Sequence, residues 1–266
     1  MTLSGRKTGG AQASNLPAEQ GELPSSRTIC ARNRVYFAVK RSFDVFSALC
    51  LCILLGPTML LCALAVKLYD GGPVFFRQQR LTGGPNGPRM FRIFKFRTMV
   101  TGAEQRGSAI TCGGDQRITP VGAFLRKFKF DEIPQIFNVL AGDMAFVGPR
   151  PQVQRVVEMA PEHFAWLHSI VAAGVTDRAS LEHRDEEQLL AGTDHPEELY
   201  REYIIPSKTA SHRRYISQMS PAEDTRVILA TLGHYLVVAP LRMLRGKPES
   251  GQPALEMSAA RQQVKA

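Results

Sequence analysis

Residues 129–151 read KFDEIPQIFNVLAGDMAFVGPRP, and the rest of the chain is organised around this segment. Two adjacent carboxylates, Asp131 and Glu132, stand directly before a short apolar run that predicts a helix over residues 134–140, closed by Gly142. A helix N-terminus presents unpaired N–H groups that attract phosphate, so the pair is expected where a phosphorylated ligand would dock. The ordinary alternative is that the two acids only cap the helix.

Cations flank the acidic pair on both sides. Arg126, Lys127 and Lys129 precede it, and Arg150 follows it between two prolines that restrict the backbone. An aspartate beside such charges is expected to stay ionised and to act as a nucleophile, while the neighbouring glutamate holds a divalent cation or orients the ligand.

Composition and charge narrow the class of protein. The 266 residues, 44% hydrophobic and 21% charged, are typical of a globular chain, and the net charge is +9. Residues 77–129 hold eleven Lys and Arg against two acids, which accounts for the whole excess. One region therefore favours an anionic partner, whether nucleic acid, a phosphorylated small molecule or an anionic membrane. The five cysteines show no disulfide or zinc spacing and indicate a reducing compartment, and no signal peptide is visible.

Residues 45–66 predict membrane contact, because they carry no charge and as a helix would be about 33 Å long. Gly56 and Pro57 fall in the middle, where a proline removes a backbone hydrogen bond. Positive residues flank the segment on both sides, which suits two ends on the same, cytoplasmic face. We therefore expect a re-entrant helix broken at Gly56-Pro57, with a spanning helix and a buried helix of a soluble core as alternatives.

The remaining chain predicts a small domain of strands and helices. Residues 74–81 and 90–99 read as a hairpin in which Lys95 and Arg97 share a face, available for phosphate or simply solvated. Thr119 and Pro120 open a basic helix that runs towards Asp131. Further helices are expected over residues 152–172, 182–190, 196–204 and 222–244, the last lying in the membrane interface or on the core. Residues 1–32 and 246–266 read as disordered tails around a membrane segment (33–70) and a catalytic domain (71–245).

Six segments, in this order along the chain, resemble the bacterial sugar transferases, which are monotopic phosphoglycosyl transferases. They are KRSFDV (40–45), GGPVFFRQQR (71–80), FRIFKFRTM (91–99), DQRITPVGAFLRK (115–127), FDEIPQIFNVLAGDMAFVGPRP (130–151) and SLEHRDEEQLL (180–190). The resemblance covers about residues 40–236. One departure is visible, because AGVTD at residues 173–177 stands where the family commonly has Pro-Gly-Ile-Thr-Gly.

The resemblance implies a mixed α/β, mostly helical monotopic membrane protein, with a re-entrant N-terminal membrane helix, a small cytoplasmic α/β catalytic domain and interfacial helices. It implies Asp131 as covalent nucleophile and Glu132 near Mg²⁺, with Asp131 as a further metal ligand. Phosphate contacts are expected from Lys95, Arg97 and Arg150, and we add Arg117 and Arg126 as candidate substrate-binding residues. The departure at residues 173–177 concerns nucleotide or sugar selectivity.

The function expected from this resemblance is transfer of a sugar 1-phosphate from a UDP-sugar to polyprenyl (undecaprenyl) phosphate, with release of UMP, as the first step of exopolysaccharide or glycoconjugate synthesis. The expected location is the bacterial inner membrane, with the catalytic domain facing the cytoplasm. Downstream glycosyl transferases are further expected partners, and nucleic acid is not. The alternatives are a membrane-tethered anion-binding protein without catalysis, which leaves the acidic pair unexplained, and a glycosyl transferase that releases UDP.

Overall fold

The computed structural model describes residues 25–84, 87–103, 115–183, 186–191 and 196–235. The first helix, α1 (Ser26–Arg32), lies within the expected N-terminal tail, so that expectation was wrong for these residues. They are ordered because Ile29 and Cys30 pack against a hydrophobic cluster of the domain. The expectations for residues 1–24 and 246–266 lie outside the described residues.

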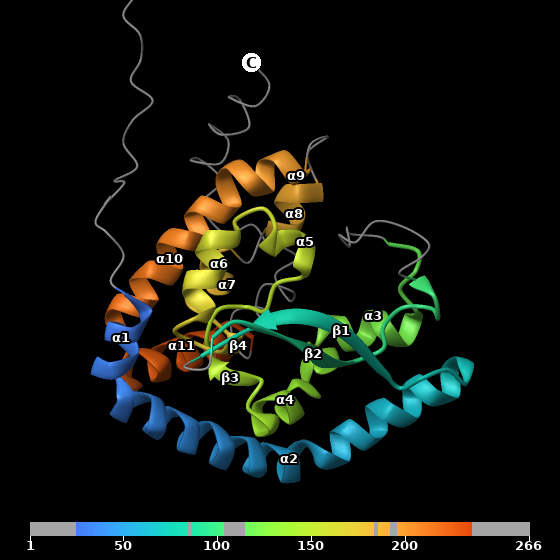
Figure 1. Ribbon diagram of the computed structural model, residues 1–266. Helices are drawn as coiled ribbons and strands as arrows, with labels where there is room; N and C mark the ends of the chain where they lie inside the picture. The colour runs from blue at the N-terminus through green and yellow to red at the C-terminus, as the bar shows by residue number, and fades with distance from the viewer. Residues whose placement is uncertain (1–24, 85–86, 104–114, 184–185, 192–195, 236–266) are drawn as a thin grey trace, which may run out of the picture.

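The second helix, α2 (Arg34–Asp70), contains the apolar segment and runs through Pro57 without interruption. Figure 1 shows that it bends near its middle and that the other elements lie on its concave side. The expected break is therefore a bend inside a continuous helix, a common effect of an internal proline. By length and composition α2 could cross a membrane. Many of its large apolar side chains are exposed, such as Ile53 (81%) and Leu54 (71%).

A hairpin follows α2. Strand β1 (Phe75–Thr82) pairs antiparallel with β2 (Arg89–Phe96), with Phe75 opposite Phe96 and Thr82 opposite Arg89. The expected hairpin is thus confirmed, but β2 ends at Phe96, so Arg97 lies just beyond the strand. Helix α3 (Pro120–Lys127) begins as expected, with Pro120 in its first turn and the Thr119 hydroxyl accepting a hydrogen bond from the Gly122 N–H at 2.9 Å.

The chain then forms a parallel pair of short strands. The expected helix after the acidic pair is α4 (Gln135–Ala141), which ends at Gly142 in the left-handed conformation. Strand β3 (Met144–Val147) follows, and its partner β4 (Ala173–Thr176) returns parallel to it after helices α5 (Gln154–Val157) and α6 (Pro161–His168). The single helix expected over residues 152–172 is thus two short helices, since Pro161 starts a new one.

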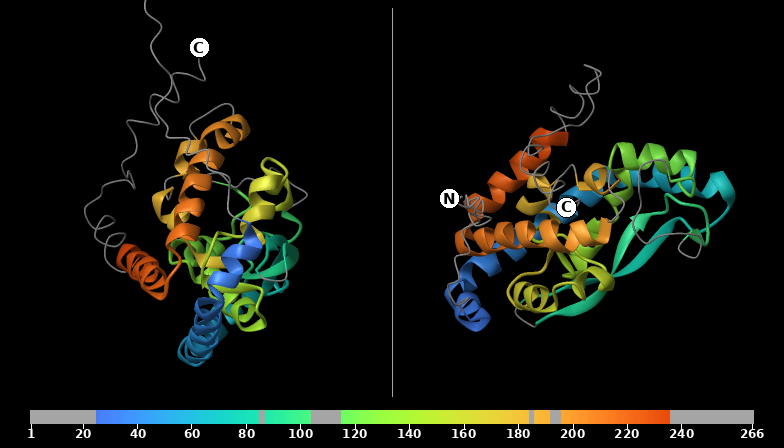
Figure 2. Two further views of the ribbon diagram at one scale, coloured as in Figure 1. Left: turned by 60° about the vertical axis from the view of Figure 1, so that its left-hand side comes forward. Right: turned by 90° about the horizontal axis from the view of Figure 1, so that it is seen from above.

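The C-terminal part is helical. It comprises α7 (Arg178–Glu182), α8 (Glu186–Ala191), α9 (Pro196–Leu199), the π-helical turn η3 (Tyr200–Ile204), α10 (Ile205–Gln218) and α11 (Pro221–Gly233). Figure 2 shows α11 projecting from one side of the domain. Figure 1 places it at the end of the domain that faces α2. The helix expected over residues 222–244 is confirmed as far as Gly233, and the part beyond residue 235 lies outside the described range.

Three charged residues of the KRSFDV segment dock α2 onto the domain. The Lys40 ammonium pairs with the Asp224 carboxylate of α11 at 2.7 Å. The Arg41 guanidinium donates to the carbonyls of Val139 and Leu140, in the last turn of α4, at 2.6 and 2.9 Å. The Asp44 carboxylate accepts from the Phe146 N–H of β3 at 3.2 Å. The N-terminal half of α2 is therefore bonded to α4, β3 and α11 through these three side chains.

Gly174 of β4 and Gly148, the residue after β3, approach so closely that neither position tolerates a side chain. A Cβ placed on Gly174 would lie 2.2 Å from both the backbone nitrogen and the carbonyl oxygen of Gly148. This glycine belongs to the AGVTD segment, whose Gly-x-Thr portion is shared with the family pattern. The packing explains why glycine is required there.

We expect Gly174→Ala to lower the free energy of unfolding by about 1–3 kcal/mol or more, because two backbone segments must separate to admit the methyl group. Gly233→Ala on α11 is the matched control, since a Cβ there meets nothing within 4 Å. The control should unfold at the wild-type temperature or slightly above it. Thermal unfolding in detergent micelles measures both variants, and equal melting temperatures would contradict the close approach.

Candidate active site

Asp131 and Glu132 lie in a single 3₁₀ turn, η2 (Phe130–Glu132), between α3 and α4. The turn is entered through Lys129, whose φ of 58° makes it the one non-glycine residue with a left-handed backbone in the described chain. No side chain caps η2 or α4 at its N-terminus. The reading of the acidic pair as an ordinary helix cap is therefore wrong, and the two carboxylates are available for other contacts.

Glu132 is bound by two cations from different elements. Its Oε1 accepts from the Lys95 ammonium of β2 at 2.7 Å and from the Arg150 guanidinium, in the loop after β3, at 2.8 Å. Burial alone would raise the pKa of Glu132, but Arg150 and Lys95 outweigh it and hold that pKa well below its usual range. Glu132 is thus an anion that holds the Lys95 and Arg150 side chains at one place.

Asp131 is different, because it is buried without being neutralised. It is 7% exposed, and its Oδ1 has no hydrogen-bond partner among the described residues. Burial, followed by the negative charge of Glu132, raises the pKa of Asp131, and Lys95 and Lys129 offset this only in part. The cations near Asp131 therefore do not outweigh its burial, and the expectation that Asp131 stays ionised and acts as a nucleophile stays a prediction. The outcome is a poorly solvated carboxylate, which is a reactive state for a nucleophile.

A buried amide on α4 holds the acidic turn against the strand that carries Lys95. Asn138 is completely buried. Its Oδ1 accepts from the Phe94 N–H at 2.8 Å and its Nδ2 donates to the Arg92 carbonyl at 2.9 Å, so it pairs with β2 as a neighbouring strand would. The sequence analysis missed this residue. An amide within an apolar helical run was the available signal, since buried amides need partners.

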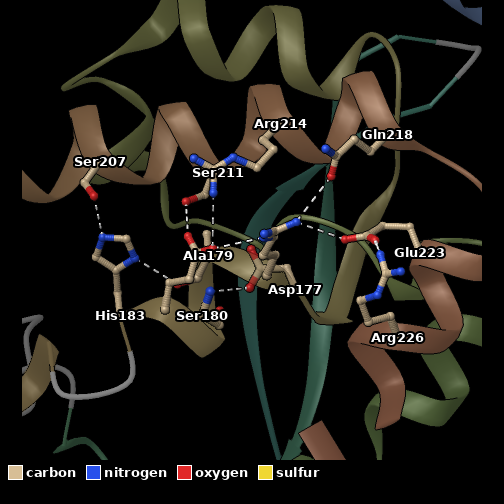
Figure 3. Close-up of polar contacts among 12 residues, drawn as sticks. Asp177, Ala179, Ser180, His183, Ser207, Ser211, Arg214, Gln218, Glu223 and Arg226 are labelled. Carbon is tan, nitrogen blue, oxygen red and sulfur yellow. Dashed lines mark hydrogen bonds and ion pairs between the residues drawn. The ribbon is translucent and has the colours of Figure 1, made fainter. Parts of the chain in front are cut away.

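Two hydrogen bonds hold the loop that carries Arg150, one to strand β4 and one to Asp177, the residue after β4. The Gly174 N–H donates to the Pro149 carbonyl at 2.9 Å, and the Arg150 N–H donates to the Asp177 carboxylate at 3.3 Å. Asp177 also caps α7 through the Ser180 N–H at 2.7 Å (Figure 3). Asp177 is one of the residues at which the chain departs from the family pattern, and here it joins Arg150 to α7.

Helix α7 is in turn attached to the two long C-terminal helices. The Ser211 hydroxyl of α10 donates to Glu182, and the Arg178 guanidinium donates to Glu223 of α11 at 3.1 Å (Figure 3). On the far side of α7, His183 contacts the Ser207 hydroxyl at 2.8 Å. Much of the SLEHRDEEQLL segment therefore serves to fix α7, and through Asp177 the Arg150 loop.

The other expected substrate-binding arginines are engaged away from Glu132. Arg97 is bidentate on the Asp70 carboxylate at the end of α2, with Nη1 at 2.6 Å from Oδ2. Arg117 pairs with Asp115 at 2.6 Å. Arg126 donates from Nε to the Thr98 hydroxyl at 2.8 Å, and its charge still acts on Asp131. The structure thus brings Lys95 and Arg150 together with the acidic pair, and the roles of these three arginines in substrate binding stay predictions.

Arg80 is a further cation beside the site that the sequence analysis did not single out. Its Nη1 donates to the Pro151 carbonyl at 3.3 Å, while its buried Nε has no hydrogen-bond partner in the described part of the chain. Burial, and then repulsion from Arg150, lowers the pKa of Arg80 to about 10. An incompletely paired guanidinium near Arg150 adds positive charge and a free N–H donor, which favour binding of an anion beside the acidic pair. Its place at the end of the GGPVFFRQQR segment was the available signal.

The acidic pair also fits a magnesium ion. Mg²⁺ is commonly bound by one or two carboxylates together with water and substrate phosphates, and not by a cage of protein ligands. Asp131 offers an oxygen without a partner, and Glu132 is adjacent. The described residues contain no cluster of three or more His, Cys, Asp or Glu that could hold a metal ion by itself.

Comparison with known proteins identifies the family of the chain. The sequence model of the bacterial sugar transferases matches residues 35–237. The chain belongs to this family. The predicted membership is confirmed, as is the prediction of an enzyme of the phosphoglycosyl transferase type at the level of the family.

Three relatives illustrate the match. The chain is 34% identical over 202 residues to the exopolysaccharide production protein PSS of Rhizobium leguminosarum, covering 73% of this chain and 93% of that protein. It is 36% identical over 193 residues to a UDP-glucose:undecaprenyl-phosphate glucose-1-phosphate transferase of Caulobacter vibrioides, covering 73% of this chain and 68% of the relative. It is 40% identical over 151 residues to an undecaprenyl-phosphate N-acetylgalactosaminephosphotransferase of Aeromonas hydrophila, covering 56% of this chain and only 35% of that longer protein.

The two basic residues once grouped on one strand face should behave differently. Lys95→Ala removes a cation from Glu132 and should reduce kcat/KM by the equivalent of about 1.5–3 kcal/mol. Arg97→Ala removes the ion pair that joins the end of β2 to Asp70 at the end of α2. This change should therefore chiefly lower the melting temperature. Steady-state kinetics and thermal unfolding of both variants separate these effects. A stable Arg97→Ala protein with the larger kinetic defect would contradict this assignment.

Proposed function

We propose that this enzyme transfers a sugar 1-phosphate from a UDP-sugar to a polyprenyl phosphate and releases UMP, as the initiating step of exopolysaccharide or glycoconjugate synthesis. The observation that carries the proposal is the Asp131 carboxylate, buried with an oxygen that has no partner, beside a glutamate that holds Lys95 and Arg150. The names of the relatives, which act on undecaprenyl phosphate, support the same reaction class.

The proposed reaction has two displacements at one phosphorus atom. An Asp131 oxygen attacks the phosphate attached to the sugar, the bond to the UMP phosphate breaks, and UMP leaves with the electron pair. A polyprenyl phosphate oxygen then attacks the same phosphorus and the bond to Asp131 breaks, which restores the carboxylate. An acyl phosphate is reactive enough for this second step, and neither displacement requires net gain or loss of a proton.

The cations around Glu132 have a defined task in both steps. Lys95 and Arg150 lie where the negative charge of the transferred phosphate has to be balanced, and Arg80 lies beside Arg150. Because Glu132 fixes Lys95 and Arg150 in advance, little reorganisation is needed as charge develops. When bound at Asp131 and Glu132, Mg²⁺ would add further countercharge for the phosphates.

The membrane helix accounts for how the two substrates meet. The acidic turn leads directly into α4, and α4 is bonded to α2 through Arg41. A soluble nucleotide sugar and a lipid phosphate can thus reach one site at the membrane surface. We propose that α2 is re-entrant in the bacterial inner membrane, with both ends and the domain in the cytoplasm. The bend near Pro57 and the docking of both halves of α2 to the domain support this.

The two competing readings differ in their products. A glycosyl transferase would release UDP, and an anion-binding protein would release no nucleotide. Incubation with a UDP-sugar and polyprenyl phosphate, followed by identification of the nucleotide, distinguishes all three. The elaborate support of the acidic pair by Asn138 and Asp177 favours catalysis over simple anion binding.

Asp131→Asn should abolish turnover and not merely raise KM, because the amide cannot form the covalent intermediate. The near-identical shape should leave folding and membrane association intact. The decisive measurement is intact mass after mixing the wild-type enzyme with UDP-sugar alone. An added sugar phosphate should appear on the peptide that contains Asp131 and be absent from the variant. A folded Asp131→Asn protein with full activity would rule out this mechanism.

The re-entrant topology predicts that single cysteines placed near Lys40 and near Lys67 both resist a membrane-impermeant thiol reagent added from outside the cell. The native cysteines are replaced first, and a cysteine in a known periplasmic protein is the positive control. Pro57→Leu should favour a spanning state, because it restores a backbone donor and removes the ring clash. Labelling at either end of α2 in the protein that retains Pro57 would exclude the re-entrant arrangement.

A further inference from the structure

An apolar pocket opens beside Glu132 and Arg150, and the function proposed above does not yet use it. Its volume is about 270 Å³. Glu132, Arg150 and Lys129 lie in its wall together with side chains from six other elements of the fold, α2, α4, β3, β4, α7 and α11. The apolar residues that line it are Leu51, Ile133, Ile136, Phe146, Val175 and Leu181.

Two features of the wall connect the pocket to the membrane. Leu51 belongs to α2, within the apolar segment, so one side of the pocket is the membrane helix itself. On another side stand Thr231, His234 and Tyr235 at the end of α11. Leu232 and Tyr235 of this region are 48% and 46% exposed, so apolar surface continues outward from the pocket. The space therefore lies between two helices that both present apolar side chains outside the domain.

The charged residues of the wall lie together, since Arg150 binds Glu132 at 2.8 Å and Lys129 precedes the turn that carries Glu132. The apolar residues come from α2, α4, β3, β4 and α7, and from Ile133 just before α4. Uncharged polar side chains are also part of the wall, namely Gln135, Thr176, Ser180, Thr231 and His234. A ligand complementary to this distribution has an anionic head and a hydrocarbon chain. A nucleotide does not match, because its base and ribose would bury several polar groups against Leu51, Ile136 and Phe146.

Resting on the proposed function, we infer that this pocket binds the first isoprene units of the acceptor lipid, with the lipid phosphate directed at Arg150. The prenyl chain enters between α2 and α11 and leaves the pocket towards the membrane. The phosphate then reaches the side of the acidic turn that Glu132 and Arg150 occupy. The pocket thereby selects prenyl phosphates over phosphates without a chain, and it gives the donor and the acceptor separate binding places.

Narrowing the pocket tests the inference. Val175→Phe adds bulk to the wall, and Val35→Phe is the matched control, since Val35 is 78% exposed on α2 and lies outside the pocket. Each rate is divided by the amount of UMP that the same preparation releases from the UDP-sugar without acceptor. That amount measures the enzyme able to carry out the first step. We expect Val175→Phe to raise KM for geranyl phosphate and for a long polyprenyl phosphate about tenfold or more, and the control to leave both KM values unchanged. Unchanged KM values in Val175→Phe would overturn the inference.

A crosslinking experiment on the wild-type enzyme covers the case in which Val175→Phe does not fold. A geranyl phosphate that carries a diazirine on its second isoprene unit should label peptides that contain Val175 or Leu181. Polyprenyl phosphate should prevent the labelling, and phosphatidylglycerol at the same concentration should not. Labelling elsewhere, or equal protection by the phospholipid, would refute a prenyl-specific pocket. Failure of the proposed function looks different, because the wild-type enzyme would then release no UMP from a UDP-sugar.

Discussion

The geometry of the acidic pair depends on how a seven-residue helix is held. A helix as short as α4 is not stable by itself, so it persists only through tertiary contacts. Asn138 pairs it with β2, and Arg41 of the membrane helix binds its final carbonyls, where a cation also complements the helix dipole. The turn with Asp131 and Glu132 is the direct N-terminal extension of this helix. Helix α2 and the strand with Lys95 therefore meet the acidic turn through one small element.

The two carboxylates have opposite environments although they are neighbours in sequence. Glu132 is saturated by Lys95 and Arg150 and stays ionised, whereas Asp131 is buried with one oxygen unpaired and has a raised pKa. Adjacent residues in a tight turn point in different directions, which allows one to organise cations and the other to face a ligand. This division of labour follows from the turn's conformation, including the left-handed backbone of Lys129, and not from the residue types.

Local signals were sufficient for the parts of the fold that local chemistry controls. The Thr119–Pro120 helix start, the Gly142 helix end and the hairpin all appear as the sequence indicated. Arg97 shows where such reasoning stops, since alternation along a strand placed it beside Lys95, yet β2 ends one residue earlier and Asp70 captures the guanidinium. Asn138 and Asp177 were missed because their partners are 44, 46 and 27 residues away in sequence, and no local pattern encodes such contacts.

The pairing of Lys40 with Asp224 has a consequence for biosynthesis, because 184 positions separate the two residues. Helix α2 leaves the ribosome long before α11 is made, so during translation Lys40 has no Asp224 to pair with. In a bilayer, an ammonium on a long stem would stay at the head-group level, where anionic lipids attract it. A polypeptide truncated before α11 would therefore carry the lysine of this buried ion pair without its carboxylate.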